Sequence, residues 1–197
     1  MYKMKNILHI FLISCFSLTV ISCAARDHEH DSTANTTIDT TTINFVGGTA
    51  SGFVLTSADG TNWTSRETAA TNPIFDIIYS NSKFVAVGYD GVIRTSSDGT
   101  SWDNSTSGTS NHLYGVTYGN SKFVAVGENG TFITSSDGTT WNVETIHTNT
   151  LYGIIYGNSK FVAVGASGTS VTSSDGVTWT ATSNILHQSA FYAITSK

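Results

Sequence analysis

Three histidines are the side chains of this sequence best suited to ligand chemistry. His147 and His187 each stand four residues before a run of β-branched and aromatic residues, and His112 stands one residue before an equivalent run. Imidazole nitrogens bind metal ions or hold acidic ligands. Because no carboxylate partner or fixed ligand spacing accompanies these histidines, we expect exposed loop residues available for binding, and we predict no metal and no cofactor.

Catalytic carboxylates are the second possibility. Glycosidases need two acids at a short fixed separation. Outside the repeated motifs described below, the acids of residues 43–197 are scattered and form no recognisable pair: Glu67, Asp76, Asp90, Asp103, Glu128 and Glu144. The sequence also lacks a Gly-x-Ser-x-Gly elbow and a phosphate-binding loop. We therefore predict no catalytic residues and a protein that is not an enzyme.

The amino-terminal segment has the pattern of a secretory signal. Lys3 and Lys5 precede an apolar run, residues 7–20, that is too short for a comfortable membrane span. Residues 20–23, Val-Ile-Ser-Cys, resemble the lipobox of bacterial lipoproteins. The resemblance implies that residues 1–22 are removed and that Cys23 is linked to diacylglycerol in the cell envelope, with the outer membrane favoured because Ala24 is no retention signal. A plain cleavable signal and an uncleaved anchor are the alternatives.

Residues 23–42 are polar and rich in threonine, without apolar periodicity, and this composition predicts a flexible tether. Its acidic and histidine cluster, residues 27–31, is expected to be solvated, although such side chains also bind divalent metals weakly. The only other cysteine, Cys15, lies in the apolar run, so no disulfide is expected. The net charge of −5 and the absence of a basic cluster beyond residue 5 disfavour nucleic acid as a partner.

From residue 43 to residue 197 the sequence repeats itself. Four tryptophans are spaced 39, 39 and 38 residues apart, and four aspartates keep the same spacing: Trp63, Trp102, Trp141 and Trp179, with Asp59, Asp98, Asp137 and Asp175. The decapeptide YGNSKFVAVG occurs twice, at 118–127 and 156–165. Internal repetition with this period is typical of repeat folds such as propellers.

Each repeat contains four short runs suited to strands, separated by turn residues. In the fourth copy they are 151–156, 160–164, 169–173 and 178–182. One four-stranded meander per repeat predicts an all-β propeller of four blades. The first copy starts at the second run, residues 43–46, and Phe191–Ile194 resembles the missing first run, so we expect this tail to lie beside Phe45 and close the ring. An open array, or an eight-bladed ring made of two chains, is the alternative.

The segments from Ser57 to Trp63 and their three counterparts resemble the Asp-box repeats of sialidase-like propellers and the repeats of the photosystem II assembly-factor family. Because all four copies keep the repeated Asp and Trp residues, we expect them to be scaffold: the Asp accepts backbone N–H groups in a turn, and the Trp fills space between units. Sialidases grip a carboxylate with three arginines. This chain has Arg26 in the tether, Arg66 and Arg94, so the resemblance does not carry the activity.

Binding is expected where the copies differ, in loops on one rim. Candidate ligand residues there are Tyr89, Asp90, Glu128, Asn129, His112, His147 and His187. Asp76 replaces the small residues of the other copies. It would line the central channel or have a simple surface or hydrogen-bonded role at the first blade, and we favour the second interpretation. We predict an envelope-tethered interaction module that presents its rim to a protein or glycan. A glycan hydrolase and an assembly factor for a membrane complex are the alternatives.

Overall fold

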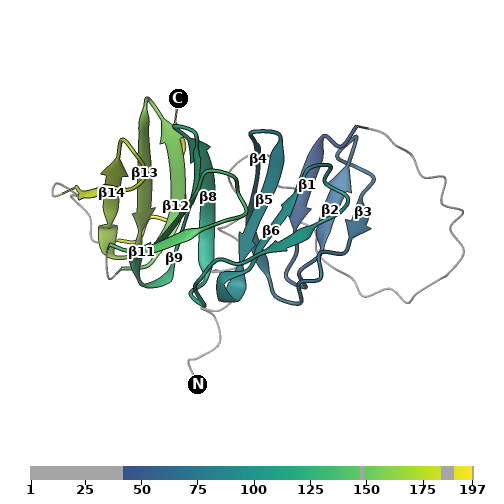
Figure 1. Cartoon of the computed structure of the whole chain (residues 1–197), viewed down its shortest axis with the longest axis horizontal. Coiled ribbons are helices and arrows are strands. Elements are labelled where there is room, and N and C mark those ends of the chain that lie inside the picture. The colour runs from purple at the N-terminus through teal and green to yellow at the C-terminus, as the bar shows by residue number, and fades with distance from the viewer. Residues whose placement is uncertain (1–41, 147–148, 183–188, 197) are drawn as a thin grey trace, which may run out of the picture.

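The computed structural model describes residues 42–146, 149–182 and 189–196, which form four antiparallel sheets standing side by side (Figure 1). We call the sheets blades 1 to 4. Blade 1 has three strands, and blades 2 to 4 have four strands each. The strands are β1 (Phe45–Gly48), β2 (Val54–Ser57) and β3 (Thr64–Arg66); β4 (Ile74–Ser80), β5 (Lys83–Gly88), β6 (Ile93–Ser96) and β7 (Asp103–Ser105); β8 (Leu113–Gly119), β9 (Lys122–Gly127), β10 (Thr131–Ser135) and β11 (Asn142–Thr145); and β12 (Leu151–Gly157), β13 (Lys160–Gly165), β14 (Ser170–Ser173) and β15 (Thr180–Ala181). The all-β meander predicted from the repeats is confirmed.

Local turn chemistry explains why each repeat folds into hairpins. The two residues between β8 and β9, Asn120 and Ser121, have φ values of 44° and 60°. Positive φ at both central residues matches the right-handed twist of the flanking strands, and Asn tolerates this conformation well. A single 3-10 turn joins the second and third strands of each complete blade: η1 (Tyr89–Gly91), η2 (Glu128–Gly130) and η3 (Ala166–Gly168).

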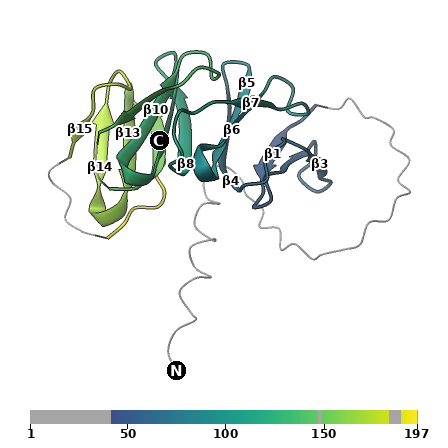
Figure 2. The same cartoon turned by 60° about the horizontal axis from the view of Figure 1, so that its bottom comes forward.

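The hydrophobic core lies between blades rather than within one layer. Val85 and Ile93 of blade 2 pack in one cluster with Phe123 and Ile133 of blade 3, and all four are fully buried. Two further clusters join blade 1 to blade 2 and blade 3 to blade 4. Strands that are apolar on both faces, such as β9, are therefore covered on both sides. Figure 2 shows the resulting succession of stacked sheets.

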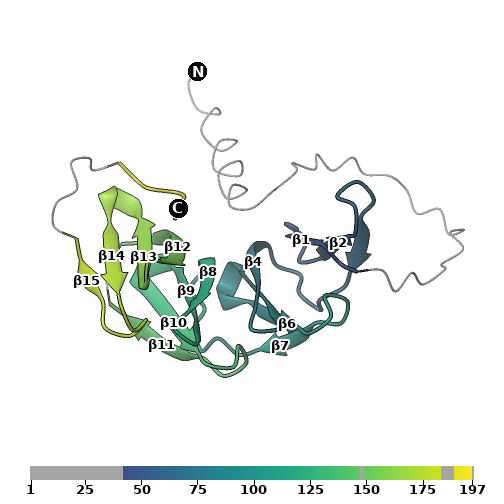
Figure 3. The same ribbon diagram turned by 90° about the horizontal axis from the view of Figure 1, so that it is seen from above.

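The four blades form an open arc, with the inner strands β4, β8 and β12 on its concave side (Figure 3). The predicted closure by Phe191–Ile194 beside Phe45 is not found. The N–H of Phe191 instead donates to the carbonyl oxygen of Gly165 at 2.9 Å, and Ile194 lies next to Gly153 of β12. The tail packs here because Gly153 and Gly157 leave room for a neighbouring chain, so this structure has the open-array alternative.

None of the described residues forms a helix that is long and apolar enough to cross a membrane. The predicted signal, the predicted lipid-attachment residue Cys23 and nearly all of the predicted tether lie outside the described residues.

Candidate functional site

The repeated Asp-Gly turns make the same internal contacts in all four blades. Asp137 Oδ1 accepts the backbone N–H groups of Thr139 and Thr140, both at 2.8 Å. Ser135 Oγ donates to Asp137 and accepts the N–H of Gly138. These backbone hydrogen bonds hold the pKa of all four aspartates, Asp59, Asp98, Asp137 and Asp175, well below its usual range. The carboxylates are engaged within their own turns, which fits a role in positioning the strands.

The four tryptophans lie over these turns but differ in their burial. Trp141 is 8% exposed between blades 2 and 3, whereas Trp63 of blade 1 is 39% exposed. In the first three copies the indole N–H donates to the glycine carbonyl of the turn, at 3.1–3.2 Å. Among the described residues the buried Nε1 of Trp179 has no such partner, and its ring centroid lies 4.2 Å from that of Phe132.

A row of aromatic rings runs from blade to blade along the inner strands. We call Phe75, Tyr114, Tyr152 and Tyr192 the aromatic row. Successive ring centroids are 5.3, 5.6 and 5.0 Å apart. In each complete blade the register of the inner strand shifts across the row residue, between Ile74 and Asp76 in blade 2 for example. A bulge of this kind re-aims a side chain out of the regular alternation. Because it occurs at the same position of each inner strand, the aromatic side chains of neighbouring blades come to lie next to one another.

The rim residues of blades 2 and 3 gather beside this row. The ring centroids of Tyr89 and His112 are 3.9 Å apart, and the N–H of Asp90 donates to His112 Nδ1 at 3.0 Å. Glu128 Oε2 accepts the backbone N–H of His112, and its Oε1 accepts the hydroxyl of Tyr114 at 3.4 Å. The turn η1, between β5 and β6 of blade 2, therefore contacts the start of β8, the inner strand of blade 3. The sequence led us to expect these two sets of loops on one rim.

His112 has a carboxylate neighbour that the sequence did not reveal. Glu128 Oε2 lies 3.8 Å from His112 Nδ1. The same Nδ1 accepts the N–H of Asp90, and its separation from Glu128 is longer than a hydrogen bond. Asn129 donates to Asn111 at 3.3 Å on the same rim, while His147 and His187 lie outside the described residues. Among those residues, no group of three or more His, Cys, Asp or Glu side chains is placed to hold a metal ion.

The hydroxyls of Tyr114 and Tyr152 in the row stay protonated. Burial, followed by the charge of Glu128, raises the pKa of Tyr114 to about 12. Burial also raises the pKa of Tyr152. A tyrosine with a raised pKa is a hydrogen-bond donor and a poor nucleophile. The site therefore combines aromatic faces, neutral hydroxyl donors and one carboxylate, which suits binding better than covalent chemistry.

The arginines of the described chain are committed to backbone and scaffold contacts. Arg94 is 7% exposed and its Nε donates to the carbonyl oxygen of Thr68 at 2.7 Å. Its Nη1 donates to the carbonyl of Ile93 and to the side chain of Asn104. Arg66 donates to Thr56 Oγ1 within its own blade. Neither arginine contacts the aromatic row in these hydrogen bonds, so the sialidase arrangement of converging arginines does not arise from them.

Asp76 joins the inner strands of two blades. Its carboxylate accepts the N–H of Val116 in β8 and the N–H of Ile77 next to it, both at 2.9 Å. Burial raises the pKa of Asp76 to about 6, against the opposing effect of these two hydrogen bonds. The hydrogen-bonded role favoured from the sequence is the one that the structure has.

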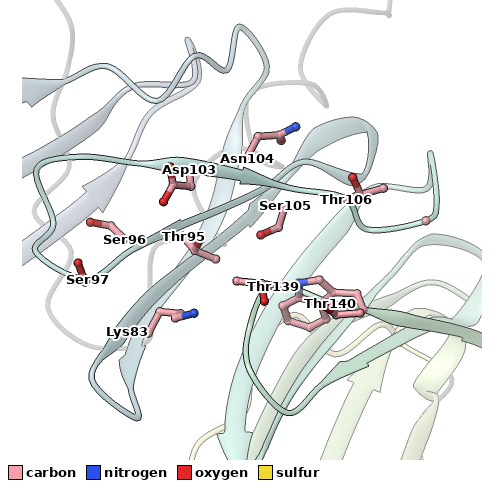
Figure 4. A pocket seen from close by; sticks show the side chains of 12 residues that line it. Lys83, Thr95, Ser96, Ser97, Asp103, Asn104, Ser105, Thr106, Thr139 and Thr140 are labelled. Carbon is pink, nitrogen blue, oxygen red and sulfur yellow. The ribbon is translucent and has the colours of Figure 1, made fainter.

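A polar groove of about 650 Å³ lies between blades 2 and 3, away from the row (Figure 4). Hydroxyl side chains dominate its lining, with Lys83 and Asp103 as the charged members. Lys83 Nζ already donates to the carbonyl oxygen of Asp137 at 2.7 Å, and Trp141 belongs to the interblade core. Because repeated scaffold residues form much of this groove, the rim and the aromatic row remain the better candidate site.

The aromatic row itself was missed in the sequence. Its signal was present, because the second residue of each inner run is Phe75, Tyr114, Tyr152 or Tyr192. An aromatic residue in an apolar run is more often part of a core, and only the strand irregularity shows that these rings form a row.

The comparisons with known proteins agree on the fold. The family model described as the DUF6242 beta propeller domain matches residues 33–151. Similar solved structures are YCF48 bound to D1 peptide (20% identity, TM-score 0.57), the computationally designed Ika8 protein (17%, 0.60) and the Neurospora crassa Pan2 WD40 domain (14%, 0.56). They cover 75%, 77% and 74% of this chain, which spans only 54%, 49% and 47% of theirs. No curated protein sequence matches the chain.

Proposed function

This chain belongs to the DUF6242 beta propeller domain family, and on that premise we propose that it is a non-enzymatic binding module that holds an extended protein segment on its aromatic row. The observation that carries the proposal is the continuous series of rings, 5.0–5.6 Å apart, across three blades and the tail. Aromatic side chains at such surfaces supply large contact areas at little entropic cost.

Charge favours a segment that carries lysine or arginine. The chain has a net charge of −5, and Glu128 lies beside the ring of Tyr114. Aromatic faces attract cations, and a nearby carboxylate adds to that attraction. Tyr192 and Tyr89 are 44% and 41% exposed, so their rings are accessible to a ligand. One similar propeller, YCF48, is seen bound to a peptide, which supports a protein partner in general.

A glycan hydrolase is less well supported. The protonated Tyr114 and the scaffold contacts of Arg66 and Arg94 leave the row without the groups that sialidase chemistry uses. The binding proposal accounts for the same residues without a catalytic step.

We further propose that Cys23 anchors the module in the cell envelope through a lipid, with the outer membrane as its location. Intact-mass measurement of the protein extracted from membranes tests this. The expected result is a chain that begins at residue 23 and carries a diacylglycerol mass, which Cys23→Ala removes. A mature chain with an unmodified Cys23 would end this part of the proposal.

Peptide binding is tested by calorimetry on the purified protein with two peptides that differ only in having lysine or glutamine at three positions. We expect the lysine peptide to bind more tightly, and Tyr152→Ala to weaken it about tenfold, which corresponds to the ~1–2 kcal/mol of a cation–aromatic contact. The matched control is Tyr79→Ala, which removes a ring that is 60% exposed and outside the row. Equal losses in both variants, capture of oligosaccharides instead of peptides, or turnover of fluorogenic glycosides would contradict the proposal.

A further inference from the structure

Within the part of the chain that the structure describes, blade 1 lacks the inner strand that every other blade has. β1 lies at the edge of its sheet, whereas its counterparts β5, β9 and β13 each pair with an inner strand. In the complete blades a tyrosine of the inner strand covers a phenylalanine of the second strand, with centroids 4.5–4.6 Å apart. Phe45 has no such cover among the described residues and is 37% exposed, while Phe123 and Phe161 are fully buried. An exposed strand edge of this kind is a site for strand addition.

The tail 191–196 lies in the place of an inner strand that belongs to a further blade. A side chain added at Gly119 of β8 would meet Tyr156 of β12, and one added at Gly157 of β12 would meet Ser196 of the tail. Likewise Gly115 faces Ile154, and Gly153 faces Ile194. The tail therefore packs on β12 as β12 packs on β8, and its sequence matches the inner run.

We propose that two copies of this chain close one ring, in which the tail of each copy forms the inner strand of blade 1 of the other. The repeat predicts the register. Phe84 pairs with Tyr79, and Ala86 pairs with Ile77. The equivalent pairs across the junction are Phe45 with Ser196 and Gly47 with Ile194. A two-fold axis makes both junctions identical and leaves no free strand edge at either junction.

Each end of the arc also carries one of the two groups that form a lysine-to-turn contact between neighbouring blades. Lys83 of blade 2 donates to the carbonyl oxygen of Asp137 in the turn of blade 3. The equivalent lysine of blade 4, Lys160, is exposed, and the equivalent turn of blade 1 contains Asp59. The proposed ring brings Lys160 of one copy to Asp59 of the other.

The repeated tryptophans are buried where a neighbouring blade covers them and exposed where the proposed second copy would lie. Trp141 is 8% exposed because blade 2 covers it, whereas Trp63, which would face blade 4 of a second copy, is 39% exposed. A hollow between the tail and blade 4 is lined by the apolar side chains of Ile155, Val162 and Ile194 and by the polar residues Asn158, Thr195 and Ser196. Blade 1 thus exposes apolar side chains that the proposed partner would bury.

The curvature of the arc favours two copies over closure within one chain. The arc superposes on about half of the length of similar solved chains, with TM-scores of 0.56–0.60. It therefore accounts for about half of a chain of that size, and a second copy would supply the rest. Closure of four blades within one chain would require each blade to turn more sharply.

Cysteine crosslinking of the full chain in detergent distinguishes these arrangements. In a Cys15→Ser, Cys23→Ser background, Phe45→Cys with Ser196→Cys is treated with a short bis-maleimide. We expect a product of twice the chain mass with a 45–196 link. A second pair, Gly47→Cys with Ile194→Cys, guards against a folding defect at Phe45, since a side chain at Gly47 meets no atom within 4 Å. The control pair, Thr100→Cys with Ser196→Cys, places one thiol on an exposed turn of blade 2 and should give no specific product.

Native mass spectrometry of the full chain in the same detergent completes the test. We expect a species of two chains, and its loss in Lys160→Glu, which puts a like charge beside Asp59. A 45–196 link within one chain would replace the proposal by a four-bladed ring. Absence of crosslinking for both pairs, together with a single-chain mass, would overturn it. The peptide-binding proposal does not depend on either result.

Discussion

Asp76 gives the sharpest test of the packing between inner strands. Its carboxylate bridges β4 and β8 by accepting the N–H groups of Ile77 and Val116. Burial nevertheless raises its pKa from 3.8 to about 6. We consider Asp76→Asn, which keeps an acceptor oxygen at the same place and removes the ionisation.

The sign follows from proton binding. Between pH 3.8 and about 6 the folded chain holds the proton of Asp76 more tightly than the unfolded chain, so the free energy of unfolding falls as pH rises through this window. A shift of about two pKa units corresponds to ~3 kcal/mol at 1.36 kcal/mol per unit. The full contribution of neutral Asp76 is present below pH 3.8 and is lost above pH 6. The variant carries no such loss, so its stability relative to wild type should rise by ~3 kcal/mol from pH 4 to pH 8.

Urea unfolding followed by tryptophan fluorescence at pH 4, 5, 6, 7 and 8 measures this difference. Only its dependence on pH matters, because any constant effect of the amide cancels. Asp103→Asn, which removes an exposed carboxylate from the same blade, is the control and should show a much smaller trend. A difference between Asp76→Asn and wild type that does not change with pH, or that falls as pH rises, would refute the assignment of burial as the dominant effect on Asp76.

Three other substitutions test the scaffold. Trp141→Ala should lower the free energy of unfolding by ~3–5 kcal/mol because it empties a buried site between blades, and Trp63→Ala should cost the isolated chain less than half as much; urea unfolding compares them. Gly127→Ala should lower the melting temperature, measured by circular dichroism, because the new methyl would meet the carbonyl oxygen of His112, which cannot move freely. In Asp137→Asn, the free energy of unfolding should fall less steeply than in wild type as the pH is lowered below 3.8 in an acid titration. The carboxylate of Asp137, whose pKa is lowered in the fold, stabilises the fold above that pH and loses this effect as it protonates.

The strand pattern was predictable because each repeat contains the residues that specify its tight turns. In the fourth copy the first run was expected at 151–156, and β12 spans Leu151–Gly157; the fourth was expected at 178–182, and β15 spans Thr180–Ala181. Asn and Ser at positive φ, and Asp beside Gly, specify tight turns through contacts with their nearest neighbours along the chain. Such contacts are local, so composition and spacing report them well.

The site was predictable only in part. Tyr89, Asp90, His112 and Glu128 were expected on one rim because loops that differ between copies gather there, and the structure brings these four together. The carboxylate neighbour of His112 and the row that includes Tyr114 were not expected. Glu128 is sixteen residues from His112, and the rings are aligned by an irregularity of strand pairing that has no signature in a single run.

The sequence alone determined the period of the repeats, the four-stranded unit and the turns that shape it, since these depend on residues a few positions apart. Tertiary structure decided how sharply the blades turn, where the tail 191–196 lies and which rings meet. These outcomes depend on packing between faces about forty residues apart, where glycines at 115, 153 and 157 admit a neighbouring strand and the cores between blades set the curvature. The tail has the sequence of an inner strand, but the surface that it covers is selected by that curvature.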